Sequence, residues 1–272
     1  MELQIFKAAW GMSGTLEDQL QTIAQAGYDG VEMAVGQPQD GPKFQRLLER
    51  YKLRFIGMIF VQGLDVTSQA ADFRRQLAAA AQWHPVKLTV HSGRDCFTLD
   101  DSCRFYESAL EAQQTVTFPV AHETHRGRAF FTPWTTAAVL ERLPELELCC
   151  DFSHWVCVCE SLLDPYEEAV RTAIEHVQHI HGRVGYEEGP QTPDPSAPEY
   201  AVQLARHEQW WDSMFAHQKS LGRELVTFTP EFGPPGYMHT LPHTNQPVAN
   251  LWDVCLWMAA RARQRFAAHF AQ

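Results

Sequence analysis

The stretch Leu146-Glu-Leu-Cys-Cys-Asp-Phe-Ser-His154 is a short, largely apolar run that passes directly into polar side chains. An apolar run of this length, bounded by polar residues, predicts a buried strand. Its Asp, Ser and His follow the last apolar position, where a parallel strand would reach the carboxyl edge of its sheet. The rest of the chain repeats this arrangement, and the repetition decides the fold class.

Short apolar or β-branched runs alternate with longer amphipathic segments along the whole chain. The predicted strands are Leu3–Trp10, Gly30–Val35, Arg54–Phe60, Lys87–His91, Thr115–His122, Leu146–Asp151, His176–His181 and Leu225–Glu231. The predicted helices begin near Leu16, Pro42, Ser68, Asp100, Thr135, Leu162 and Pro198, and the last covers Val248–Phe270. Such alternation indicates right-handed crossovers and a parallel sheet. We therefore expect residues 1–272 to form a single (β/α)8 TIM-barrel domain of the α/β class.

Composition narrows the classes of function. The formal net charge of -11 disfavours a general affinity for nucleic acid, because neutralising phosphates needs clustered Lys and Arg. No apolar run is long enough to span a bilayer, and Met1–Trp10 reads as a strand rather than a leader. We therefore expect a cytoplasmic protein without a membrane partner. The 7 cysteines lack the spacing of a disulfide framework and are expected to be reduced.

Carboxylates and imidazoles gather near the ends of the last five predicted strands. In chain order, with one arginine, these residues are His91, Glu123, Asp151, His154, His179, His181, Arg183 and Glu231. In a closed parallel barrel, the carboxyl ends of all strands open onto one face, which carries the catalytic groups. We therefore expect these side chains to converge there.

Converging carboxylates predict a site for one divalent metal ion. Two Glu, one Asp and one His form an oxygen-rich ligand set that suits Mn²⁺, Mg²⁺ or Co²⁺, with Zn²⁺ as an alternative. Without a cation, burying these groups together would cost desolvation energy and cause repulsion. Whether His179 or His181 completes the set stays open, because residues two apart on a strand share a face.

These residues resemble the xylose-isomerase-like superfamily of TIM barrels. The motifs that carry the likeness are Glu123, Asp151-x-x-His154, His179-x-His181-x-Arg183 and Glu231. The likeness runs the whole length of the chain, through every strand–helix unit. The superfamily covers sugar isomerases and epimerases, inosose and dehydroshikimate dehydratases, and the endonuclease-IV type of apurinic endonuclease.

The resemblance to the ketose 3-epimerase branch implies a role for each motif. The implied metal ligands are Glu123, Asp151, His181 and Glu231. The two glutamates would also act as the catalytic residues that transfer the proton. The expected substrate contacts are His91, His154 and Arg183. Arg183 lies closer in sequence to His181 than the corresponding arginine does in the epimerase pattern.

We therefore expect a metal-dependent sugar isomerase or epimerase that acts on a small carbohydrate or polyol. A metal chelated by two substrate oxygens stabilises the enediolate that forms when a proton beside the carbonyl is removed. One carboxylate would take that proton and a second would return it. The same residues suit a dehydratase or lyase acting on a keto-polyol, so this alternative stays open.

Two further functions remain as minor alternatives. A barrel that binds a sugar without catalysis would need only the metal-anchoring residues. An apurinic endonuclease would need extra histidines, one of them at the third strand end, where this chain has Gly57-Met-Ile-Phe60.

Two segments outside the motifs also carry expectations. Val184–Glu199 is a long connection rich in Gly, Pro and acidic residues, which we expect to be a lid or pocket wall. The last predicted helix bears Trp252, Leu256 and Trp257, which we expect to pack on the barrel. Part of its surface would be available for a homodimer contact.

Overall fold

A computed structural model describes residues 1–38 and 40–270. Its strands are β1 (Glu2–Ala8), β2 (Gly30–Ala34), β3 (Arg54–Phe60), β4 (Lys87–His91), β5 (Val120–Glu123), β6 (Leu148–Cys150), β7 (Val177–His181) and β8 (Leu225–Thr229). Its helices are α1 (Leu16–Gln25), α2 (Gly41–Tyr51), α3 (Val66–Ala81), α4 (Leu99–Gln113), α5 (Pro133–Arg142), α6 (Phe152–Cys159), α7 (Glu167–Glu175), α8 (Ala201–Ser220) and α9 (Leu251–His269). The 3₁₀ turns η1 (Asp164–Tyr166) and η2 (Pro198–Tyr200) precede α7 and α8.

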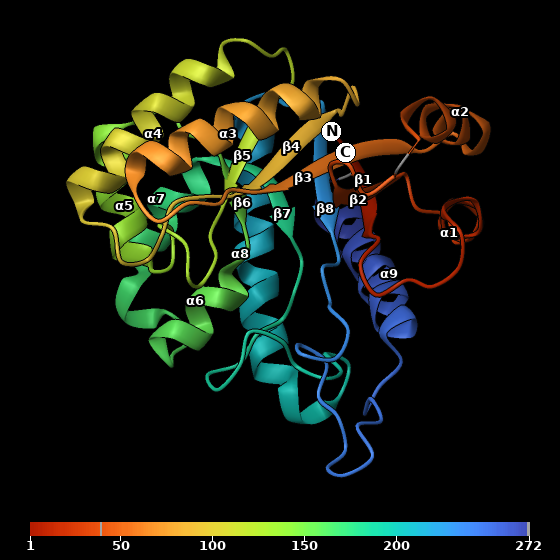
Figure 1. Ribbon diagram of the computed structural model, residues 1–272. Helices are drawn as coiled ribbons and strands as arrows, with labels where there is room; N and C mark the ends of the chain where they lie inside the picture. Colours follow the sequence, from red (N-terminus) through yellow and green to blue (C-terminus); the bar gives the residue numbers. More distant parts are fainter. Residues whose placement is uncertain (39, 271–272) are drawn as a thin grey trace.

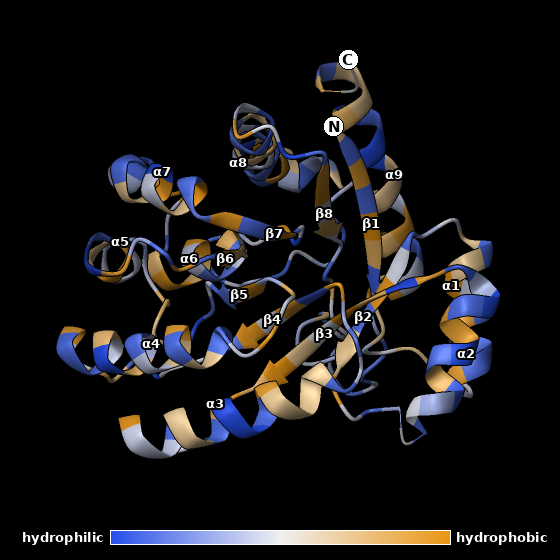
Figure 2. Ribbon diagram, turned by 90° about the horizontal axis from the view of Figure 1, so that it is seen from above, coloured by the Kyte–Doolittle hydropathy of each residue, from blue (hydrophilic) through white to orange (hydrophobic). Residues whose placement is uncertain are grey.

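The eight parallel strands close into a barrel in sequence order, which confirms the predicted (β/α)8 fold. The ring closes where β1 pairs with β8, with Ile5 opposite Phe228. Figure 1 shows the connections from β7 to α8 and from β8 to α9 at one end of the barrel, and both chain termini at the other. Seen from above, the strands form an inner ring and most helices lie outside it (Figure 2). Within the described ranges, no helix is long and apolar enough to cross a membrane.

The strand predictions are right in position, and most strands are shorter than predicted. The bounds of β3 and β4 coincide with the prediction. β5 begins at Val120 rather than Thr115. Pro119 stands directly before it and has no N–H to donate to a neighbouring strand.

A helix directly after β6 is the main departure from the prediction. We expected one helix beginning near Leu162, but the chain forms α6 immediately after Asp151 and α7 only after η1. The first five residues of α6 are buried, so its sequence lacks the polar face that marks a surface helix. Asp151 caps the helix by accepting a hydrogen bond from the backbone N–H of Ser153. This helix places His154 within one turn of Asp151.

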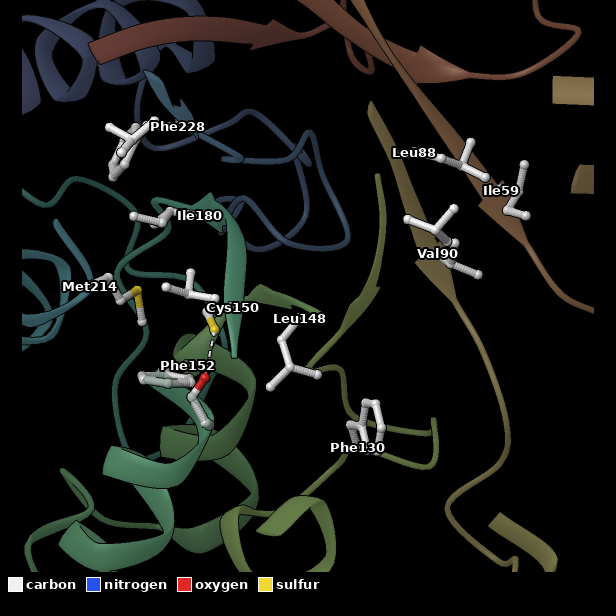
Figure 3. Packing of buried hydrophobic residues seen from close by; sticks show 14 of the residues in the cluster. Ile59, Leu88, Val90, Phe130, Leu148, Cys150, Phe152, Ile180, Met214 and Phe228 are labelled. Atoms are coloured by element: carbon white, nitrogen blue, oxygen red, sulfur yellow. Dashed lines mark hydrogen bonds between the residues drawn. The ribbon is translucent and has the colours of Figure 1, made fainter. Parts of the chain in front are cut away.

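The hydrophobic core lies between the strands and the surrounding helices (Figure 3). Ile180 of β7, Phe228 of β8 and Met214 of α8 all belong to it and are almost fully buried. The rings of Phe228 and Trp211 meet edge to face with centroids 5.2 Å apart. Stability therefore depends on the outer faces of the strands, which leaves their carboxyl ends free to carry polar groups.

Gly182 has no room for a side chain, because a Cβ there would overlap the ring of Phe228. We predict that Gly182→Ala lowers the free energy of unfolding by about 1–3 kcal/mol, the usual cost of overpacking a core. Urea denaturation measures this change. Gly41→Ala is the control, since a Cβ there would meet only Trp83 at 3.6 Å, an ordinary contact. Equal losses in the two variants would contradict the packing argument.

Candidate active site and metal centre

Four predicted metal ligands meet at the carboxyl ends of β5 to β8. Glu123, Asp151, His181 and Glu231 are all buried, and each offers a ligand atom within 4.8 Å of the others. Glu123 and His181 end their strands, whereas Asp151 and Glu231 follow theirs by one and two residues. The structure thus brings together all four side chains of the predicted ligand set.

The two histidines of β7 lie at different depths. Nδ1 of His181 is 3.3 Å from Oε1 of Glu123 and 3.2 Å from Oε2 of Glu231. Nδ1 of His179 is instead 2.7 Å from the hydroxyl of Thr227, inside the barrel. His181 is therefore the histidine that shares the carboxylate cluster, and His179 fills the interior beneath it.

Glu32 on β2 is a buried carboxylate to which the sequence analysis assigned no role. Its Oε1 is 3.1 Å from Nε2 of His181, and its Oε2 is 3.3 Å from Nε2 of His179. The hydroxyls of Thr89 and Thr229 each donate a 2.6 Å hydrogen bond to it. We call these five residues the Glu32 network. A carboxylate on the far nitrogen of a histidine fixes the orientation of its ring, as in many metal sites.

Charge compensation holds the Glu32 network together. Burial alone would raise the pKa of Glu32, but attraction to His181 and hydrogen bonds with His179 and His181 outweigh it, and the pKa lies well below its usual value. Burial lowers the pKa of His179 itself to about 4. Burial likewise opposes a charge on His181, yet Cys149, Glu231 and Glu32 raise its pKa well above the usual value. The carboxylates around His181 thus require positive charge among them.

Arg183 is buried among polar partners. Its Nη2 forms an ion pair with Asp151 and lies 3.3 Å from Oε2 of Glu231 and 2.7 Å from Nε2 of His154. Its Nε donates a 3.1 Å hydrogen bond to Ser153 Oγ. Burial raises the pKa of Asp151 to about 6, against the lowering effect of Arg183. Arg183 therefore positions Asp151, in addition to any contact with a substrate.

Three imidazoles lie beside Glu123. Nε2 of His91 is 2.6 Å from Oε2 of Glu123. The ring of His125 lies between those of His91 and His154, with centroids 4.6 and 3.8 Å away. Burial lowers the pKa of His125 to about 3 and that of His154 well below its usual value. Both rings are therefore neutral and suited to hydrogen bonds with hydroxyl groups. The sequence analysis assigned no role to His125, although it follows Glu123 by two positions.

Several buried polar atoms of this region have no hydrogen-bond partner. Nδ1 of His154 and Nη1 of Arg183 are two of them. Oε2 of Glu123 and Oε2 of Glu231 also form no hydrogen bond, although the first lies 2.6 Å from Nε2 of His91 and the second 3.3 Å from Nη2 of Arg183. Buried groups of this kind are uncommon, because each loses its bonds to water without replacement. Carboxylate oxygens that form no hydrogen bond, beside one imidazole nitrogen, are the donor set that a divalent cation takes. The residues present therefore fit the predicted metal ion.

The cluster faces a cavity of about 330 Å³. Polar side chains that line it are Glu32, Gln37, His91, His125, Arg128, Arg183, Glu231 and Tyr237. The ring of Tyr237, from the segment after β8, lies 4.7 Å from the guanidinium of Arg183. Two of the three predicted substrate contacts, His91 and Arg183, line this cavity, and His154 lies directly behind them.

The segment 184–199, expected to be a lid or pocket wall, packs against the segment after β8. Gln191 exchanges hydrogen bonds of 3.1 and 2.7 Å with the backbone of Gly233, two residues beyond Glu231. Among the described residues, none of this segment lines the cavity. It supports the position of Glu231 instead.

Comparisons with known proteins show a family and a set of similar structures. The model of the family described as xylose isomerase-like TIM barrel matches residues 20–215. A sugar phosphate isomerase/epimerase from Parabacteroides distasonis is similar in structure, with a TM-score of 0.61, 10% identity, and coverage of 95% of this chain and 92% of that one. A search among curated proteins finds no matching sequence.

Two further solved structures share the fold. One is a xylose isomerase-like TIM barrel protein from Mycobacterium smegmatis in complex with magnesium, with a TM-score of 0.61, 11% identity, and coverage of 98% of this chain and 97% of that one. The other is the probable 3-DHS dehydratase AsbF from Bacillus anthracis, with a TM-score of 0.59, 14% identity, and coverage of 95% and 98%. Similarity at identities this low shows a common fold only, so the reaction has to be inferred from the residues of the site.

Removing the carboxylate of Glu32 should destabilise the protein strongly. We predict that Glu32→Ala lowers the free energy of unfolding by about 3–5 kcal/mol, because it leaves buried imidazoles and hydroxyls without their acceptor. Glu32→Gln should cost less, since it keeps one acceptor oxygen. Urea denaturation provides the measurement, with Glu111→Ala as an exposed control that should change stability by less than about 0.5 kcal/mol. A Glu32→Ala variant as stable as the control would show that the Glu32 network contributes nothing to the stability of the fold.

Proposed function

The chain belongs to the xylose isomerase-like TIM barrel family, and from this premise we propose that it is a divalent-metal-dependent isomerase or epimerase. Its substrate would be a small compound that carries a hydroxyl group beside a carbonyl group, as sugars and keto-polyols do. The observation that carries the proposal is the cluster of Glu123, Asp151, His181 and Glu231. It combines a cation site with two carboxylates that can move protons.

We propose that these four residues hold one cation, Mn²⁺, Mg²⁺ or Co²⁺, with Zn²⁺ as an alternative. His181 would bind it through Nδ1, because its Nε2 already faces Glu32. When bound, the ion would act as a Lewis acid and stabilise negative charge on the substrate oxygens. Arg183 would keep Asp151 oriented for this role.

Glu123 and Glu231 are the proposed acid–base pair. Isomerisation and epimerisation both need a group that removes a proton beside the carbonyl and a group that returns it. Oε2 of each glutamate forms no hydrogen bond and would hold the proton, with Nε2 of His91 2.6 Å from that of Glu123 and Nη2 of Arg183 3.3 Å from that of Glu231. The rings of His91, His125 and His154 would form hydrogen bonds with the substrate hydroxyls.

A dehydratase is the second candidate. Loss of water begins with the same proton abstraction and then needs a donor for the departing hydroxide. The glutamate that took up the proton would give it to that hydroxide, so that water leaves, and Nη1 of Arg183, which has no hydrogen-bond partner, could hydrogen-bond to the leaving oxygen. The two reactions would share Glu123 and Glu231 and differ in where the substrate places its leaving hydroxyl.

Metal content tests the proposed cation site. After reconstitution with Mn²⁺ and dialysis, we expect about one ion per chain by mass spectrometry, as one mononuclear site requires. Asp151→Asn should lose most of this metal while keeping the circular dichroism spectrum of the wild type. Asp100→Asn, which changes an exposed carboxylate at the start of α4, should retain it. A wild-type protein that holds no metal would overturn the proposed site.

Deuterium exchange tests the reaction. Ketoses and inososes are incubated with the Mn²⁺-loaded protein in D₂O and followed by NMR. An isomerase or epimerase should give a new isomer with deuterium beside the carbonyl, whereas a dehydratase should give an unsaturated product. Glu231→Gln should lower the rate by about 10²–10⁴-fold, the usual contribution of a general acid or base, with its fold intact. Full activity in this variant would exclude the two-glutamate mechanism.

A further inference from the structure

The two sides of the cavity differ in chemistry. The carboxyl ends of β4 to β8 supply the carboxylates, imidazoles and guanidinium described above. The side formed by β1 to β3 is lined by Ala8, Trp10, Met33, Ala34, Met58 and Phe60. Glu32 also comes from β2, but its oxygens are engaged in the Glu32 network. Gln37 adds one polar side chain, at the exposed rim.

The β1–β3 side is unsuited to a chain of hydroxyl groups. A hydroxyl that loses water without gaining a hydrogen bond costs free energy, and a sugar that filled this cavity would place several of them there. The partners available are the indole N–H of Trp10, which has no hydrogen bond in the protein, and the amide of Gln37. Met33 and Met58 are 4% and 8% exposed and present soft thioethers, which pack well against alkyl and aromatic groups.

The apolar side also continues toward the polar one through aromatic contacts. The ring of Trp10 meets that of Tyr237 edge to face, with centroids 5.3 Å apart. The ring of Phe60 lies 4.5 Å from that of His91. A substrate bound at the carboxylates would therefore meet aromatic and thioether groups as soon as it extends toward β1, β2 or β3.

We propose that the substrate joins a hydroxy-carbonyl head, which reacts at Glu123 and Glu231, to an apolar remainder that packs against the β1–β3 side. This inference rests on the proposed function for the head and narrows the substrate class. The substrate is an aryl- or alkyl-substituted hydroxy-ketone or hydroxy-acid rather than a sugar hydroxylated on every carbon. A cavity of about 330 Å³ is at the small end of ligand pockets, so the remainder is limited to about one six-membered ring.

Two hydroxamates with the same chelating head test the proposal. Benzohydroxamate carries a phenyl ring, and glycolohydroxamate carries a hydroxymethyl group. Their dissociation constants are measured by calorimetry on the Mn²⁺-loaded full chain and divided by those for free Mn²⁺. We expect benzohydroxamate to bind about tenfold more tightly or better, the factor given by burying roughly 60 Å² of apolar surface. Equal affinities, or a preference for glycolohydroxamate, would overturn the proposal.

Variants test whether the preference for benzohydroxamate over glycolohydroxamate arises from the β1–β3 side. Met58→Gln keeps the length of the side chain but makes it polar, and should reduce the preference at least about threefold. Phe60→Ala should act in the same direction, and because Phe60 is 38% exposed its removal leaves no core void. Met12→Gln is the control, since Met12 lies in a separate surface pocket. A preference that survives both Met58→Gln and Phe60→Ala would overturn the assignment.

A metal-independent measurement separates this inference from the proposed function. If neither hydroxamate binds the Mn²⁺-loaded protein, the proposed metal site fails, and the metal-free chain is tested by saturation-transfer NMR. Benzyl alcohol should then receive magnetisation from the protein, less so in Met58→Gln, and glycerol should receive none. No transfer to benzyl alcohol, or a stronger transfer to glycerol, would overturn the inference.

Discussion

His181 is the side chain on which the polar interior of the barrel depends. Its Nε2 faces Glu32, and its Nδ1 faces Glu123 and Glu231. Three buried carboxylates around one imidazole can coexist only if positive charge is supplied among them, because removing each charge from water costs several kcal/mol. In the metal-free protein a second proton on His181 meets part of this requirement, and a divalent cation that replaced the proton at Nδ1 would meet it more fully. The arrangement of the site is thus set by the excess negative charge of its buried carboxylates rather than by a single catalytic group.

The barrel separates the interactions that stabilise the fold from those that form the site. Apolar side chains such as Ile180 and Phe228 face outward, under the helices, and account for the core. The carboxyl ends of the strands contribute little to that core, so they can carry groups that are costly to bury. Contacts beside the site position its ligands. Ser153 and Arg183 bind the carboxylate of Asp151, and Gln191 hydrogen-bonds to the backbone beyond Glu231.

The family match and the geometry of the site support different conclusions about this protein. The match to the xylose isomerase-like TIM barrel family establishes ancestry, and the structural neighbours, at 10% to 14% identity, establish the fold. Those neighbours include a sugar phosphate isomerase/epimerase and a probable dehydratase, so the fold alone does not distinguish the two reactions. The division of the cavity into a polar and an apolar side comes from the geometry alone, since Met33 and Met58 line the same cavity as His91 and Arg183.

The sequence by itself determined the barrel and most of its active face. Strand and helix periodicities are local properties, so the eight strands could be located, and the polar residues that follow β5 to β8 could be assigned to one end. The α6 helix was missed because its apolar residues are buried on most sides and show no polar stripe. Glu32 was missed because its partners His179 and His181 lie 147 and 149 positions away in the chain. Only the closed barrel decided which of these two histidines joins the carboxylates, because both point inward and their depth depends on contacts across the ring.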